Sequence, residues 1–208
     1  MRTIFSCCLL TFVCLFIGCD IAVPESGSGE RGALEPQIEK PVDHLAEATT
    51  LTKEGITAKI ASWEETEQLV KSHAGKVVVL DLWSTWCEPC LRELPYLVAL
   101  QKKYPDQVVA ISFNMNYDGS KSAPPESNGD DILEALAKMK ADIHNIISST
   151  PDEDLYEKID LASIPAVLVY SADGKLAKRF SDESGEYGQT GFSYEKHITP
   201  FVEKLLKK

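Results

Sequence analysis

Short apolar runs alternate with amphipathic segments along residues 49–208, and this order is typical of an α/β domain. Residues 77–83 form an apolar run interrupted by Asp81 alone, which predicts a central strand buried on both faces. Ser62 followed by Glu65 is a capping box, so a helix should begin there and end near Gly75. Further strands are expected at residues 56–60, 108–113, 166–170 and 175–180, further helices at 88–104, 130–139, 151–159 and 194–206, a polar loop at 114–128 and a hairpin turn at 172–174.

Residues 1–18 have the pattern of a signal peptide and lie outside the predicted domain. Arg2 precedes an apolar run at residues 4–17, which is too short to span a bilayer core comfortably. The run ends in Gly18-Cys19, which resembles a bacterial lipobox and implies cleavage before Cys19 with lipid attached to its sulfur. An ordinary secretory signal with an incidental cysteine is the alternative interpretation. Both interpretations predict that the protein is exported.

Residues 19–48 are predicted to be a flexible linker that carries the lipid anchor at its first residue. The segment is rich in Pro, Gly, Ser and Glu and shows no sustained hydrophobic period. A coil of this length has a root-mean-square reach on the order of 30 Å. A domain at residues 49–208 could therefore move near a membrane surface while tethered to it.

The chain is acidic, with a formal net charge of −11 from 21 basic and 32 acidic residues. Removal of residues 1–18, whose one charged side chain is Arg2, changes that net charge to −12. Such a charge disfavours binding to nucleic acid and to anionic lipid headgroups. Charged partners should therefore be basic.

Cys87 and Cys90 carry most of the predicted chemistry, because the other cysteines belong to the N-terminal segment: Cys7, Cys8, Cys14 and Cys19. A Cys-x-x-Cys pair directly after a predicted strand is typical of a redox centre. A structural zinc site would need a second pair of Cys or His ligands, and the sequence offers none. We therefore expect no metal and no cofactor. A permanent structural disulfide is the alternative, but so short a loop would constrain the unfolded chain little.

The predicted order of elements resembles the thioredoxin fold, and the residues around the cysteines resemble the TlpA/ResA-type family of exported, membrane-linked thiol-disulfide oxidoreductases. The resemblance runs from about Lys59 to the C-terminus. It implies a three-layer α/β fold with a central mixed β-sheet flanked by helices. Four features in family-like order carry it: Trp83-x-x-Trp86-Cys87-x-Pro89-Cys90, Glu93-Leu94-Pro95, Ile164-Pro165 before a strand, and an Asp173-Gly174 turn.

Cys87 lies where the active-site helix should begin, and the positive end of a helix stabilises a thiolate. We therefore expect Cys87 to attack a substrate disulfide and form a mixed disulfide. Cys90, one turn further into the helix, should then attack Cys87 and release the reduced substrate. Cys90 is thus the predicted resolving thiol.

Two carboxylates are candidates for accepting the proton of Cys90. Asp81 matches the position where thioredoxins carry a buried Asp, although the TlpA/ResA-type branch often has Asn there. Burial in an apolar strand should raise the pKa of Asp81 and suit it to proton transfer near neutral pH. Glu93 matches a glutamate that tunes the active site in that branch, and a solvated acid in the first turns of a helix is the alternative for this residue. The division of labour between the two acids stays open.

Three further residues are expected to contact substrate: Trp86, Ile164 and Pro165. The resemblance makes Pro165 the family's cis-proline beside the cysteine pair, where the backbone of Ile164 is offered to an extended substrate peptide. Ala166 stands where the family commonly has Thr. Trp86 should lie at the rim where substrates dock, whereas Trp83 should pack in the core.

The predicted function is reduction of disulfides in extracytoplasmic proteins by the Cys87/Cys90 dithiol. The family suggests apocytochrome c as one substrate and a membrane thiol protein as electron donor. The predicted location is the cell envelope, with a lipid anchor on the periplasmic or extracytoplasmic side of a membrane. A disulfide oxidase or isomerase would use the same residues at a different reduction potential. A copper chaperone of similar fold would need a Cys-x-x-x-Cys spacing and a distal His, neither of which is evident, and a non-catalytic binding module would not need both cysteines.

Overall fold

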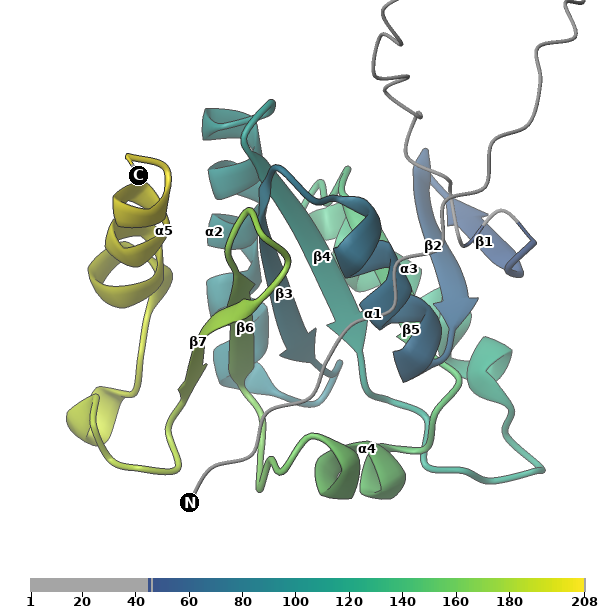
Figure 1. Ribbon diagram of the computed structural model, residues 1–208. Coiled ribbons are helices and arrows are strands. Elements are labelled where there is room, and N and C mark those ends of the chain that lie inside the picture. The colour runs from purple at the N-terminus through teal and green to yellow at the C-terminus, as the bar shows by residue number, and fades with distance from the viewer. Residues whose placement is uncertain (1–44, 46, 208) are drawn as a thin grey trace, which may run out of the picture. The chain divides into compact units, whose positions relative to one another are not determined.

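A seven-stranded mixed β-sheet forms the centre of the domain in the computed structural model, which describes Leu45 and residues 47–207 (Figure 1). The predicted signal peptide, the lipid site at Cys19 and linker residues 20–44 lie outside the described residues. The strands follow the order β1-β2-β5-β4-β3-β6-β7. Their bounds are Thr50–Lys53 (β1), Ile56–Ala61 (β2), Val77–Trp83 (β3), Val108–Asn114 (β4), His144–Ser148 (β5), Ala166–Tyr170 (β6) and Leu176–Ser181 (β7).

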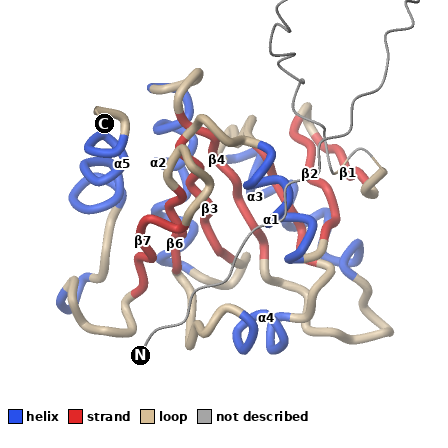
Figure 2. Tube along the Cα trace, in the orientation of Figure 1, coloured by secondary structure: helices blue, strands red, loops and turns tan. Residues whose placement is uncertain are grey.

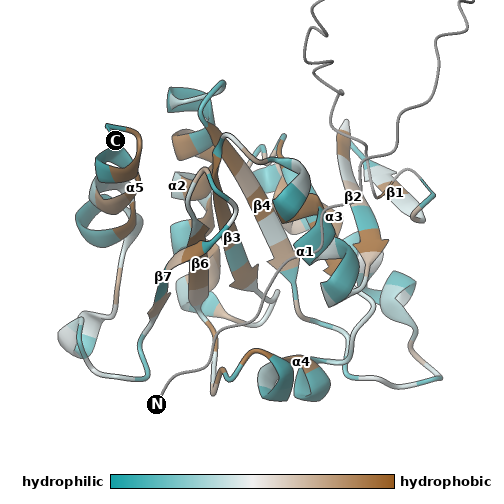
Figure 3. Ribbon diagram, in the orientation of Figure 1, coloured by the Kyte–Doolittle hydropathy of each residue, from teal (hydrophilic) through white to brown (hydrophobic). Residues whose placement is uncertain are grey.

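Strands β2, β5, β4 and β3 pair in parallel, whereas β1, β6 and β7 pair antiparallel with their neighbours. Every residue of β3 and β4 is buried, which explains why their sequences are nearly continuous apolar runs. The hydrophobic colour in Figure 3 accordingly concentrates on the central strands. The strand that follows Pro165, β6, pairs with β3 on one side and β7 on the other, so it is an interior strand as expected.

Helices cover both faces of the sheet and complete the three predicted layers (Figure 2). One face is covered by α2 (Glu88–Lys103), α3 (Gly129–Lys138), a π-helical turn η3 (Tyr194–Ile198) and α5 (Thr199–Leu205), and the other by α1 (Trp63–Ser72) and α4 (Asp152–Lys158). Each face has its own core, with Val79 and Trp83 on the α2 side and Leu80 and Leu82 on the α1 side. Because side chains alternate along a strand, Asp81 belongs to the α2 side.

The local signals read from the sequence are present in the structure. At α1 the Ser62 hydroxyl accepts the Glu65 backbone N–H at 3.2 Å, and the Glu65 carboxylate accepts the Ser62 N–H at 2.7 Å. The hairpin turn between β6 and β7 contains Gly174 with a φ of 77°, a conformation that favours glycine. The capping box and the hairpin are therefore confirmed.

Strands β1 and β5 were not predicted from the sequence. In β5, two apolar residues lie between polar ones, and hydropathy alone assigns such a segment to a loop. His144 is exposed, whereas the polar residues Asn145 and Ser148 are buried because each has a hydrogen-bond partner in the fold. The Asn145 amide accepts a hydrogen bond from the Ser112 hydroxyl at 2.8 Å and donates to the Ala141 carbonyl at 2.8 Å.

The two ends of the domain also differ from the expectation. Leu45, assigned to the linker, is buried in the α1-side core, so the packed chain reaches at least to this residue. The predicted C-terminal helix at 194–206 is divided into the π-helical turn η3 and the short helix α5. Pro200 lies in the first turn of α5 and has no N–H with which to continue an α-helical ladder from η3.

Candidate active site

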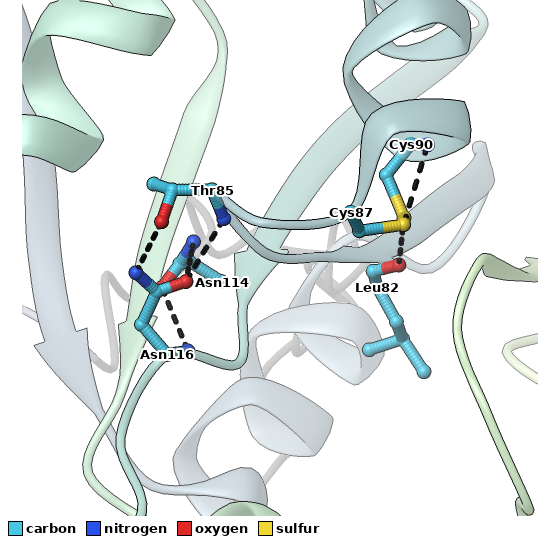
Figure 4. The surroundings of a disulfide bond; sticks show 6 residues. All are labelled: Leu82, Thr85, Cys87, Cys90, Asn114 and Asn116. Atoms are coloured by element: carbon cyan, nitrogen blue, oxygen red, sulfur yellow. Dashed lines mark hydrogen bonds between the residues drawn. A yellow bond between two sulfur atoms is a disulfide. The ribbon is translucent and has the colours of Figure 1, made fainter.

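The Cys87-x-x-Cys90 motif lies where β3 has ended and α2 begins. Cys87 is the N-cap residue of α2, and its Sγ accepts a hydrogen bond of 3.3 Å from the backbone N–H of Cys90. The two sulfurs are joined in a disulfide bond (Figure 4). Pro89 occupies the first turn of α2, where a backbone N–H would have no acceptor within the helix. The motif therefore holds the sulfur of Cys87 at the positive end of a helix.

The two sulfurs differ in their surroundings. Cys87 is 5% exposed and Cys90 is 1% exposed. The Sγ of Cys90 lies 4.0 Å from the carbonyl oxygen of Leu82, against the backbone of β3 (Figure 4). Cys87 is thus the outer and Cys90 the inner member of the pair, an order that suits an attacking and a resolving thiol.

Trp86 and the Ile164–Pro165 pair have the exposure that a substrate-contacting surface needs. Trp86 is 64% exposed although it directly precedes Cys87, whereas Trp83 is fully buried. The Ile164–Pro165 peptide bond is cis, and both residues are half-buried just before β6. Ile164 packs against the core that contains both cysteines. An apolar side chain that is so exposed beside a reactive group is suited to contact a partner protein.

Asp81 is the one charged residue of β3 and is 2% exposed. Burial raises the pKa of this carboxyl to about 7, because removal of water disfavours the charged form. A hydrogen bond from Tyr194 acts in the opposite direction and lowers the pKa, while the negative charge of Glu93 raises it further. The carboxyl of Asp81 can therefore gain and lose a proton near neutral pH.

Tyr194 is a site residue that the sequence analysis missed. Its hydroxyl donates a hydrogen bond of 2.7 Å to Oδ2 of Asp81, and its side chain is fully buried. The chain between β7 and α5 returns to the active-site helix, where η3 packs against α2. No local pattern in the sequence indicates that contact, because it joins residues 113 positions apart.

Glu93 is less exposed than a solvated helix acid would be. Its side chain is 14% exposed, and its Oε2 accepts the backbone N–H of Tyr194 at 3.0 Å. Its Oε1 lies 3.7 Å from Nε of Arg92. The structure thus connects both predicted acids to the same residue, since Asp81 binds the hydroxyl of Tyr194 and Glu93 binds its backbone.

A second group that the sequence analysis missed holds the loop in front of Cys87. The side-chain oxygen Oδ1 of Asn116 accepts the backbone N–H of Thr85 at 3.0 Å, and the side-chain Nδ2 of Asn116 donates to the Thr85 hydroxyl at 2.7 Å (Figure 4). Asn114 is buried at the end of β4 and exchanges two further hydrogen bonds with Asn116. The predicted polar loop at 114–128 is therefore wrong by one residue at its start, because Asn114 ends β4, and the first residues of the loop bond to the segment that precedes Cys87.

The described residues contain no group of three or more His, Cys, Asp or Glu side chains that could hold a metal ion. Among the helices of residues 45–207, none is both long enough and apolar enough to cross a membrane. The groups that the structure places at the site include the Cys87–Cys90 disulfide and the buried Asp81 carboxyl with its Tyr194 partner.

Comparisons with known proteins place this chain among thiol-disulfide oxidoreductases. The family model described as Redoxin matches residues 51–192. The thiol-disulfide oxidoreductase ResA of Bacillus subtilis (strain 168) is 25% identical over 113 residues, which cover 50% of this chain and 52% of ResA. The protein SUPPRESSOR OF QUENCHING 1, chloroplastic, of Arabidopsis thaliana is 28% identical over 157 residues, which cover 72% of this chain and 14% of that protein. The matched region thus spans about half of the first relative and a small part of the second.

Among solved structures, a secreted disulfide oxidoreductase of Mycobacterium tuberculosis, described as homologous to DsbE of E. coli, aligns with a TM-score of 0.49. It shares 19% sequence identity, and the alignment covers 79% of this chain and 99% of that one.

Proposed function

The chain belongs to the redoxin family, in the ResA-type group of thiol-disulfide oxidoreductases, and from this premise we propose that its Cys87/Cys90 dithiol reduces disulfides in extracytoplasmic proteins. The observation that carries the proposal is the position of Cys87. Its sulfur caps the N-terminus of α2 and accepts the N–H of Cys90, an environment that stabilises a thiolate.

The proposed reaction has two exchange steps. The Cys87 thiolate attacks one sulfur of a substrate disulfide, so that a Cys87–substrate disulfide forms and the second substrate sulfur leaves as a thiolate. The Cys90 thiol then gives its proton to the Asp81 carboxylate, and the resulting Cys90 thiolate attacks the Sγ of Cys87. The Cys87–Cys90 disulfide forms, the first substrate sulfur leaves as a thiolate, and two electrons have passed to the substrate. A thiol protein of the membrane would then be oxidised to its disulfide and return two electrons to the pair, and the proton held by Asp81 would go back to Cys90, so that the Cys87 thiolate and the Cys90 thiol are restored.

The N-terminal sequence supports a location in the cell envelope. The run that ends in Gly18-Cys19 resembles a lipobox, and residues 19–44 would connect the lipid to the domain. In the proposed arrangement the protein faces the periplasmic or extracytoplasmic side, where apocytochrome c is one suitable substrate. The acidic balance of the chain favours basic substrate surfaces over nucleic acid.

A redox titration tests the direction of electron flow. For a reductase, the Cys87/Cys90 potential should lie near the value of thioredoxin, about −270 mV, rather than near that of a strong oxidant such as DsbA, about −120 mV. The protein should also catalyse reduction of insulin disulfides by dithiothreitol. A potential near the oxidant value, with catalysed oxidation of a reduced substrate, would make the protein an oxidase or isomerase instead.

Substitution of Cys19 tests the lipid anchor. In cells given labelled palmitate, the protein should become labelled, and Cys19→Ser should abolish the label. Cys14→Ser is the matched control, because Cys14 lies inside the signal segment and should leave the label unchanged. Labelling of the Cys19→Ser variant would show that lipid is attached at another residue, and an unlabelled unmodified protein would show that it carries no such anchor.

A further inference from the structure

Tyr194 donates two hydrogen bonds, and each joins it to one of the acidic residues of the site. Its hydroxyl donates to Oδ2 of Asp81 at 2.7 Å, and its backbone N–H donates to Oε2 of Glu93 at 3.0 Å. The side chain is fully buried in the core that also contains Cys87 and Cys90. The position of the hydroxyl is thus fixed both by packing and by the backbone contact to α2.

The hydroxyl of Tyr194 remains a donor over the working pH range. Burial and the negative charge of Asp81 raise the pKa of Tyr194 well above its ordinary value, so the group stays neutral and protonated. A neutral donor at this distance favours the carboxylate form of Asp81, which can accept a proton, over the carboxylic acid, which cannot. Without that donor, burial and the charge of Glu93 would both favour the acid.

The strand neighbours of Asp81 and the charged group on α2 do not stabilise its carboxylate form as the Tyr194 hydroxyl does. On the neighbouring strands, the residues paired with Asp81 are Ser112 in β4 and Val167 in β6, and neither titrates near neutral pH. On α2 the charged group that acts on Asp81 is Glu93. Within the described residues, Tyr194 is the side chain recorded as donating a hydrogen bond to the Asp81 carboxyl.

We propose that Tyr194 is the positioning residue of the resolving step: its hydroxyl keeps Asp81 in the proton-accepting form, and Glu93 holds Tyr194 in place through the backbone. The proposal rests on the proposed reductase function, because it assigns Asp81 the proton of Cys90. Tyr194 does not touch substrate and acts through Asp81. Its two acidic partners therefore have different duties, one in proton transfer and one in support.

Two variants that affect Asp81 in opposite directions test the proposal. Tyr194→Phe keeps the ring and removes the hydroxyl, so the pKa of Asp81 in the oxidised protein should rise by about one unit, the size expected for a hydrogen bond to a charged acceptor. Glu93→Gln keeps an oxygen that accepts the Tyr194 N–H but removes a negative charge, so the pKa of Asp81 should fall. The carbon-13 shift of the Asp81 carboxyl, followed by NMR across pH, reports both changes without any turnover.

Tyr104→Phe is the matched control. The hydroxyl of Tyr104 also donates to a carboxylate, Oε1 of Glu203 at 2.7 Å, but it lies at the far end of α2. This control should leave the Asp81 titration unchanged. In stopped-flow measurements, the rate at which the mixed disulfide is resolved should also depend on pH. Tyr194→Phe should shift the midpoint of that rate profile to higher pH by the same amount as it shifts the Asp81 titration.

The outcomes separate the positioning role from the reductase function. An Asp81 titration that is the same in Tyr194→Phe, Tyr104→Phe and the unmodified protein would overturn the role of Tyr194, even if the protein reduces disulfides. A shifted titration with an unshifted resolution profile would overturn it as well. A shifted titration in a protein that reduces no disulfide would support the control of Asp81 by Tyr194 and reject the proposed function.

Discussion

Tyr194 and Asp81 are 113 positions apart in the sequence and are joined by a hydrogen bond of 2.7 Å in the core of the domain. The contact joins η3, near the C-terminus of the chain, to β3, the strand that precedes the active-site motif, and η3 also packs against α2. It also gives a buried carboxyl one defined partner. The free energy of unfolding should therefore depend on pH through the protonation of Asp81.

The first prediction concerns stability and pH. Burial raises the pKa of Asp81 to about 7, whereas the unfolded chain should ionise near 3.8. Between these two values the folded protein holds a proton that the unfolded chain has lost, so the free energy of unfolding should fall as pH rises from about 4 to about 7. The shift of about three units corresponds to about 4 kcal/mol at most.

Asp81→Asn should remove this pH dependence. The amide keeps an oxygen that can accept the Tyr194 hydroxyl, but it carries no charge at any pH. The variant should therefore be more stable than the unmodified protein at pH 8 by up to about 4 kcal/mol, with a difference that shrinks toward pH 4. Urea unfolding of the oxidised proteins at several pH values measures this, and Asp106→Asn, at an exposed position, is the control. An equal pH profile for Asp81→Asn and the unmodified protein would show that Asp81 is not proton-linked to folding.

The second prediction concerns the loop that precedes Cys87. Asn116→Ala removes the amide that bonds to Thr85 at both its backbone N–H and its hydroxyl. The variant should lose about 1–3 kcal/mol of unfolding free energy, because the half-buried Thr85 and the buried Asn114 lose hydrogen-bond partners. It should also slow attack of Cys87 on a substrate disulfide, since the loop is no longer fixed. Urea unfolding and stopped-flow reduction measure the two effects.

Ser122→Ala in the same segment is the control for Asn116→Ala, because Ser122 is exposed and its hydroxyl bonds only to that of Ser120 among the recorded side-chain contacts of the described residues. It should change neither quantity. If Asn116→Ala behaves like this control, the Asn116 network has no part in holding the site.

Much of this arrangement could be predicted from the sequence, because it depends on local signals. The capping box of α1, the apolar run of β3 and the Cys87-x-x-Cys90 pair at the start of α2 each depend on residues a few positions apart. The parts that could not be predicted depend on distant contacts. Strand β5 contains polar residues that are stable inside the sheet only because Ser112 and Ala141 bond to Asn145.

The same reason explains the missed site residues. Nothing near Tyr194 in the sequence indicates a partner on β3, and nothing near Asn116 indicates a bond to Thr85. A long-range hydrogen bond leaves no periodic pattern in a single sequence. Glu93 was singled out from the family resemblance, but its bond to the backbone of Tyr194 became visible in the folded chain alone.

The third prediction concerns Trp86. Trp86→Ala should raise the KM for a protein disulfide by about tenfold, the effect of ~1.4 kcal/mol, because an exposed aromatic side chain beside the nucleophile is lost. The rate with a small disulfide reagent should stay unchanged, since such a molecule needs no docking surface. Steady-state kinetics with both substrates separate the two effects. Tyr96→Ala, at an exposed aromatic residue of α2, should alter neither rate. A loss with both substrates for Trp86→Ala would contradict a docking role.

The roles of the two cysteines are tested most directly by trapping mixed disulfides. Cys90→Ala leaves Cys87 able to attack but removes the thiol that resolves the intermediate, so it should accumulate covalent complexes with protein substrates on non-reducing gels. Cys87→Ala should accumulate few or none, because Cys90 is buried against the backbone of β3. Equal trapping by the two variants, or reduction of insulin disulfides by the double variant, would contradict the assignment of Cys87 as nucleophile and Cys90 as resolving thiol.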